Sequence, residues 1–136
     1  MLMLTAIVIT ALQAAPPPIA LRDHAPPRQI ENVIAIDCGA YRARVSRRWS
    51  SSNEADLKLT IGGHDIPPAQ LATVRNATPI LNQNVSVSGL CHPESLIVET
   101  AGDSGRFAII FADGTLQAVM KDNHTIWSAR ADAHEK

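Results

Sequence analysis

Aromatic residues are scarce in this chain, and their scarcity limits the interior that it can build. Phenylalanine, tyrosine and tryptophan make up 4% of the 136 residues, so the core must come from valine, isoleucine, leucine and alanine. Such a core favours strands over a large ligand cage. No stretch of about 20 apolar residues is present to cross a bilayer. We also find no catalytic or cofactor motif that its sequence context supports, and we expect no cofactor.

An excess of charge of one sign is missing too. The chain has 12 lysines and arginines against 13 aspartates and glutamates, which gives a formal net charge of −1. A chain so balanced is not drawn as a whole to nucleic acid or to an anionic membrane. The few aromatic side chains also leave no platform on which bases could stack. We therefore expect no nucleic-acid partner, and any electrostatic function must be local.

Residues 2–15 form an apolar run that three polar residues interrupt. The run is too short to span a membrane and meets three prolines at 16–18, which cannot continue a helix. Its length and the small residues at its end fit a signal peptide with cleavage near Ala14. An uncleaved anchor is the alternative, because no lysine or arginine precedes the run. Export predicts a periplasmic or secreted protein that meets the membrane only during its passage.

The rest of the chain has the length of one ordinary domain with a single core. We divide the sequence into a signal peptide over 1–15, a proline-rich extended leader over 16–31, a single β domain over 32–130 and a frayed polar tail over 131–136. No internal repeat is visible.

Alternating apolar and polar residues recur at short spacing with turn residues between them. This pattern predicts an all-β, mostly antiparallel fold, either a small sandwich or a closed barrel, with one short helix near 67–76. Residues 33–38 and 106–112 are apolar on both alternating faces, which predicts two interior strands. Asp113-Gly114 predicts a type I′ hairpin turn, because this pair adopts positive φ at low cost.

The two cysteines, Cys38 and Cys91, are too far apart in the chain for the Cys-x-x-Cys spacing of redox enzymes. Cys38 shares a strand face with Ile36, and Cys91 shares one with Val87. Both sulfur atoms should therefore point into the same interior, which predicts a Cys38–Cys91 disulfide in an oxidising compartment. Two buried free thiols are the alternative.

Two features suggest catalysis or metal binding. Residues 102–105, Gly-Asp-Ser-Gly, resemble the segment around the nucleophilic serine of chymotrypsin-like proteases, which would make Ser104 a nucleophile. The resemblance covers these four residues alone, and glycine, aspartate and serine are also ordinary turn residues. His64, His92 and His124 lie beside predicted turns, without the spacing of metal ligands. We interpret both features as turn chemistry.

Three arginines form the one local charge feature. Arg42, Arg44 and Arg48 occupy alternating positions of a predicted strand, so they should share one face. Such a row could hold an anionic partner such as phosphate, a lipid head group or an acidic polysaccharide. The alternative is a solvated face whose charge is balanced by Glu54 and Asp56.

These observations together predict an exported, disulfide-stabilised binding or interaction module of the cell envelope, without chemistry of its own. Its partner would be an envelope protein or an anionic ligand. The alternatives are a small secreted hydrolase or a metal-binding protein that uses the serine or the histidines above, and a structural subunit of an envelope assembly.

Overall fold

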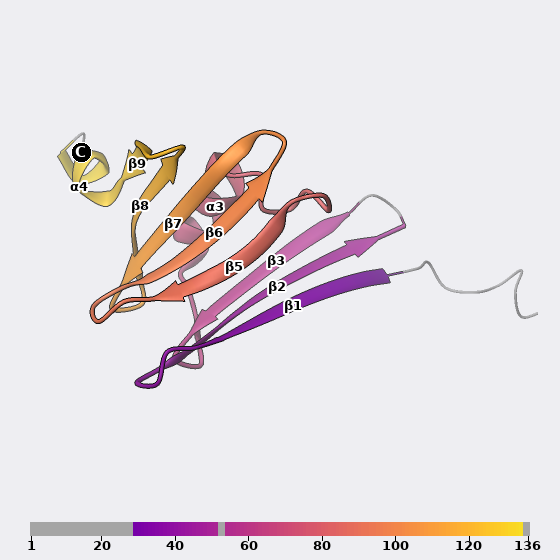
Figure 1. Ribbon diagram of the computed structural model, residues 1–136, viewed down its shortest axis with the longest axis horizontal. Coiled ribbons are helices and arrows are strands. Elements are labelled where there is room, and N and C mark those ends of the chain that lie inside the picture. The colour runs from indigo at the N-terminus through magenta and orange to yellow at the C-terminus, as the bar shows by residue number, and fades with distance from the viewer. Residues whose placement is uncertain (1–28, 52–53, 135–136) are drawn as a thin grey trace, which may run out of the picture.

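A computed structural model describes residues 29–51 and 54–134 as nine strands and two helices (Figure 1). The signal peptide predicted over 1–15 and all but the last three residues of the predicted leader lie outside the described residues. The elements in chain order are β1 (Gln29–Asp37), β2 (Arg42–Ser50), β3 (Ala55–Ile61), β4 (His64–Asp65), α3 (Pro68–Ala77), β5 (Ser86–Cys91), β6 (Leu96–Gly102), β7 (Gly105–Ala112), β8 (Thr115–Lys121), β9 (His124–Ser128) and α4 (Ala129–His134).

The strands form two antiparallel sheets. Sheet A has the order β1-β2-β3-β4, and sheet B has the order β5-β6-β7-β8-β9, so within each sheet consecutive strands pair with each other. The two sheets do not close into a barrel, and their arrangement is that of a sandwich. The predicted all-β, mostly antiparallel class with one short helix near 67–76 is therefore confirmed, since α3 covers Pro68–Ala77.

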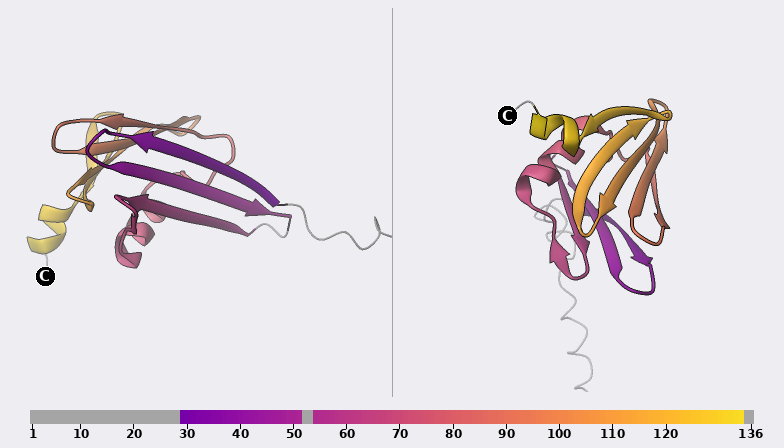
Figure 2. Two further views of the ribbon diagram at one scale, coloured as in Figure 1. Left: turned by 90° about the horizontal axis from the view of Figure 1, so that it is seen from below. Right: turned by 90° about the vertical axis from the view of Figure 1, so that its left-hand side faces the viewer.

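The sheets come together along one edge and are separated at the other (Figure 2). At the close edge β1 contacts β5. A Cβ atom on Gly89 of β5 would lie 2.3 Å from Cδ1 of Ile36, so any larger residue at this position would force the Ile36 side chain to move. At the other edge α3 contacts both β3 and β8. The Leu116 amide of β8 donates a hydrogen bond of 2.9 Å to Oε1 of Gln70 in α3, which fixes the helix over that opening.

The core lies between the two sheets and is almost wholly aliphatic, as the composition predicts. Fully buried members come from β2, β3, α3, the segment between α3 and β5, and strands β6, β7 and β8: Val45, Leu57, Leu59, Val74, Ile80, Leu96, Val98, Ile109, Phe111, Leu116 and Val119. The prediction of an interior strand over 106–112 is confirmed, because β7 is the middle strand of sheet B.

The same prediction for residues 33–38 is wrong. Among the described strands, β1 lies at one edge of sheet A and pairs only with β2. Ile36 is buried, but Val33 on the opposite face is 39% exposed, because none of the described elements covers that face. An apolar residue on the outer face of an edge strand gives the same sequence pattern as one on a strand buried on both sides.

Two domain boundaries also differ from the prediction. β1 begins at Gln29, inside the predicted leader, because β2 is long enough to pair with it as far as Ser50. The polar segment predicted to fray over 131–136 is helical through His134. The Ser128 hydroxyl accepts a hydrogen bond of 3.2 Å from the Ala131 amide, which satisfies a free donor in the first turn of α4.

The turn residues behave as their chemistry predicts. Asp113 and Gly114 have φ values of 53° and 74°, as the type I′ turn between β7 and β8 requires. The segment over 102–105 is the tight turn between β6 and β7, in which Gly102 pairs with Gly105.

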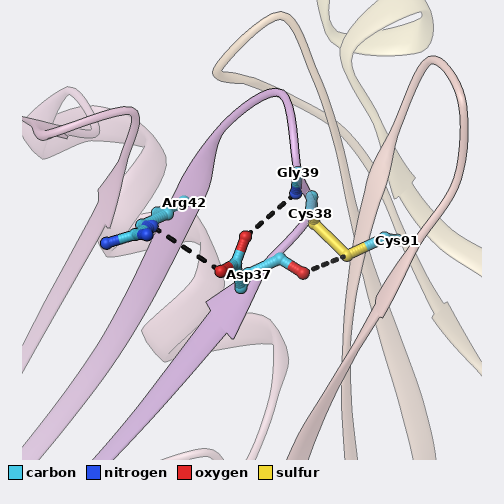
Figure 3. The surroundings of a disulfide bond; sticks show 5 residues. All are labelled: Asp37, Cys38, Gly39, Arg42 and Cys91. Atoms are coloured by element: carbon cyan, nitrogen blue, oxygen red, sulfur yellow. Dashed lines mark hydrogen bonds and ion pairs between the residues drawn. A yellow bond between two sulfur atoms is a disulfide. The ribbon is translucent and has the colours of Figure 1, made fainter.

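Cys38 and Cys91 form a disulfide at the close edge of the two sheets (Figure 3), with a Cα–Cα distance of 5.4 Å. Cys38 directly follows β1 and Cys91 ends β5, so the bond ties the two sheets together where they meet. Cys91 is exposed, and the bond therefore lies at the margin of the core. Beside it, Oδ1 of Asp37 accepts a hydrogen bond of 3.0 Å from the Gly39 amide, which orders the turn that follows β1.

Candidate functional site

The solvent-facing side of β1, β2 and β3, here called the arginine face, carries the three arginines that the sequence singles out. β2 alternates regularly between buried and exposed residues, and Arg42, Arg44 and Arg48 all lie on its exposed side. The outward residues of β1 are Glu31, Val33, Ala35 and Asp37, and those of β3 are Asp56, Lys58 and Thr60. The face thus holds four cationic and three acidic side chains.

Two of the three arginines are paired with acids on β1. Nε of Arg42 lies 3.7 Å from Oδ2 of Asp37, and Nη2 of Arg48 lies 3.7 Å from Oε1 of Glu31. The register of β1 and β2 places each arginine directly opposite its partner. The counter-ions are therefore not Glu54 and Asp56, as the alternative interpretation of the sequence supposes.

Arg44 and Lys58 are the remaining cations of the arginine face. Arg44 lies opposite Ala35 on one side and Thr60 on the other, and Lys58 lies opposite Ser46, so the two cations are diagonal neighbours on adjacent strands. Both side chains are exposed, and within residues 29–51 and 54–134 neither makes an ion pair. Diagonal neighbours on antiparallel strands have Cα atoms about 7–8 Å apart, which allows two side chains to reach one ligand.

A shallow hollow of about 330 Å³ lies between these two cations. Ser46 and Thr60 supply hydroxyl groups to its lining. Glu31 also lines it, but its carboxylate accepts a hydrogen bond of 3.4 Å from the Ser46 hydroxyl and pairs with Arg48. The arrangement can hold an anionic group with two charges and a hydroxyl. The predicted anion site of three arginines is therefore replaced by one of Arg44 with Lys58. Lys58 is not among the residues that the sequence singles out.

Arg47 does not belong to the arginine face, although it stands among the arginines in the sequence. It faces inward and is 4% exposed. Its Nη1 donates to the carbonyl oxygens of Ile80 at 3.1 Å and Val85 at 3.0 Å, and its Nη2 donates to Oδ1 of Asn32 at 2.8 Å. The guanidinium also lies 5.1 Å from the ring centre of Trp49. Desolvation by burial lowers the pKa of Arg47, and its role is to join sheet A to the segment that leads into β5.

The residues of the enzymatic alternative are spread over the molecule. Ser104 is exposed in the turn between β6 and β7, and its hydroxyl has no hydrogen-bond partner within the described ranges. His64 begins β4 and His92 directly follows β5, whereas His124 begins β9 at the opposite end of sheet B. No group of three or more histidine, cysteine or acidic residues that could hold a metal ion is found in the described part of the chain.

Fold and site together define a disulfide-bridged β-sandwich with a partly neutralised cationic face. Comparison with protein-family models, with curated proteins and with solved structures gave no match for this chain. Of the helices in the described residues, none has the length and apolar character needed to cross a bilayer.

Proposed function

We propose that this protein is an exported binding module that holds a phosphate or sulfate group of a larger ligand on the arginine face, between Arg44 and Lys58. The observation that carries the proposal is a pair of exposed cations that make no ion pair with any described residue, beside a hollow edged by hydroxyl groups. Arg42 and Arg48 belong to the same row, but their acids reduce what they can offer an anion.

Export is the second part of the proposal. The disulfide is compatible with a protein of a non-reducing compartment, since such bonds are rare where glutathione keeps thiols reduced. The apolar run over 2–15 supplies the route, with cleavage near Ala14. Sequencing the amino terminus of the protein recovered from the periplasm or the medium tests this part. Recovery from the cytosol with Met1 attached would overturn it.

Retention on immobilised heparin and on vesicles tests the anion site, with phosphatidylglycerol vesicles as the phosphate source and phosphatidylcholine vesicles as the uncharged control. The variant Arg44→Gln/Lys58→Gln should bind roughly tenfold more weakly, because it loses two exposed charge contacts. The matched variant Arg75→Gln/Arg130→Gln removes two exposed arginines from the helices and should bind like the wild type.

The two sources of the anion are separated by which surface retains the protein. Retention on heparin alone indicates an acidic polysaccharide, and retention on phosphatidylglycerol vesicles alone indicates a lipid head group. Equal losses in the two double variants would show that net charge governs retention, and the proposed site would be wrong. Failure of the wild type to bind either surface would overturn it as well.

A further inference from the structure

A second hollow, of about 380 Å³, opens at the end of the sandwich that carries the disulfide. We call it the disulfide-end hollow. Its floor is formed by Leu96 and Phe111, which lie opposite each other on β6 and β7 and are each 1% exposed. Tyr41 and Ile61 form the walls, and both are half-buried. The volume falls in the range of pockets that take small molecules.

The rim of this hollow is acidic. Glu94, from the turn between β5 and β6, and Asp113, from the turn between β7 and β8, both line it and are exposed. In the ranges 29–51 and 54–134 neither carboxylate makes an ion pair or accepts a hydrogen bond. Arg42 comes from the same end of β2, but its guanidinium is paired with Asp37. An apolar interior therefore lies below a mouth with two uncompensated negative charges.

The segments around the mouth are held in place by covalent and hydrogen bonds. The disulfide joins the residues directly before two of the turns that line the hollow, the turn over 39–41 and the turn over 92–95. The Cys38 amide donates to the Tyr41 carbonyl at 2.9 Å, and the His92 amide donates to the Ser95 carbonyl at 2.8 Å. Asp113 stands in a type I′ turn. A site that is ordered before binding loses less entropy when the ligand enters.

We propose that the disulfide-end hollow binds an amine that carries an aryl or alkyl group. The apolar group would pack between the half-buried side chains of Tyr41 and Ile61, above the floor of the hollow, and lose its contact with water, which favours binding. The ammonium would remain at the mouth, where Glu94 and Asp113 attract it and where it keeps part of its hydration. A carboxylate of the same shape would meet two like charges and be excluded. This site is separate from the arginine face and takes the opposite charge.

Three probes of similar shape and different charge test the proposal: phenethylamine, 2-phenylethanol and phenylacetate. Each is titrated into the oxidised full-length protein, and the amide signals of residues around the hollow are followed by NMR. Phenethylamine should bind most tightly and phenylacetate should not bind. A peptide with phenylalanine at its amino terminus is an additional probe. It presents the same phenyl group and primary ammonium as phenethylamine, but at the end of a polypeptide.

The variant Glu94→Gln/Asp113→Asn removes the charge with little change of shape, and asparagine tolerates positive φ. It should weaken phenethylamine binding about tenfold and leave 2-phenylethanol binding unchanged. Arg44→Gln/Lys58→Gln should leave the amine affinity unchanged, so failure of the anion site and failure of this one can be told apart. Equal binding of the amine and the alcohol to the wild type would overturn the proposal. The proposal would also be wrong if phenethylamine shifted only the amide signals of residues that lie far from Leu96 and Phe111.

Discussion

Replacing Arg47 by methionine should lower the free energy of unfolding by about 2–4 kcal/mol. The side chain is 4% exposed and donates to the amide oxygen of Asn32 and to three backbone carbonyl oxygens, of which those of Ile80 and Val85 are buried and that of Asn82 is partly buried. No carboxylate is bonded to this guanidinium within the described residues. Its partners in the described part of the chain are therefore neutral oxygen atoms and the ring of Trp49.

The magnitude follows from what methionine keeps and what it removes. Its volume fills much of the space of the arginine, so the cavity term is small. The two buried carbonyls lose their donor at about 1–3 kcal/mol each, which sums to about 2–6 kcal/mol. Against this, the variant no longer has to remove a cation from water, which offsets part of the loss. The remainder is the predicted 2–4 kcal/mol.

Urea unfolding under oxidising conditions, followed by tryptophan fluorescence and by circular dichroism, measures this loss. The matched control is Arg44→Met, which makes the same substitution on the exposed face of the same strand and should change stability by less than about 0.5 kcal/mol. If Arg47→Met proves as stable as Arg44→Met, the carbonyls do not depend on the guanidinium and the reasoning is wrong.

Three further predictions concern stability. Replacing both Cys38 and Cys91 by alanine opens a link between residues 53 positions apart and should cost about 4 kcal/mol in urea unfolding; a loss below about 1 kcal/mol would contradict the chain-entropy estimate. Thr100→Val should leave stability unchanged or raise it by about 1 kcal/mol in thermal unfolding, because the buried Thr100 hydroxyl has no hydrogen-bond partner among the described residues; a loss would reveal a hidden partner. Gly89→Ala should destabilise the protein by about 1–3 kcal/mol through overlap with Ile36, and an Ile36→Ala background should remove most of that cost in a double-mutant cycle.

The sequence identifies the faces of β2 well, because alternation needs only local information. Arg42, Arg44 and Arg48 share the exposed side as predicted. The same alternation places Arg47 on the buried side. Whether a buried arginine is stabilised there can be judged only when its hydrogen-bond partners are known. Those partners lie 33 and 38 residues further along the chain, at Ile80 and Val85.

The counter-ions of the arginine face show a second limit. The pairing of Arg42 with Asp37 depends on β1 and β2 forming a tight hairpin, and on the register that this hairpin sets. The apolar residues of β1 predict an interior strand, and this prediction does not indicate that the outer face of β1 carries the acids that pair with Arg42 and Arg48. Lys58 was missed for a related reason, because its place beside Arg44 follows only from the pairing of β2 with β3.

The two proposed sites give opposite local fields to a protein whose formal net charge is only −1. The ion pair of Arg42 with Asp37 lies between them, next to Cys38, and neutralises both charges there. Within the described residues, the cations at the middle of the arginine face and the acids at the mouth of the disulfide-end hollow make no ion pair. Salt should weaken both sites through screening. Only the substitutions at each site separate them, because each double variant removes one sign of charge from one place and leaves the other field intact.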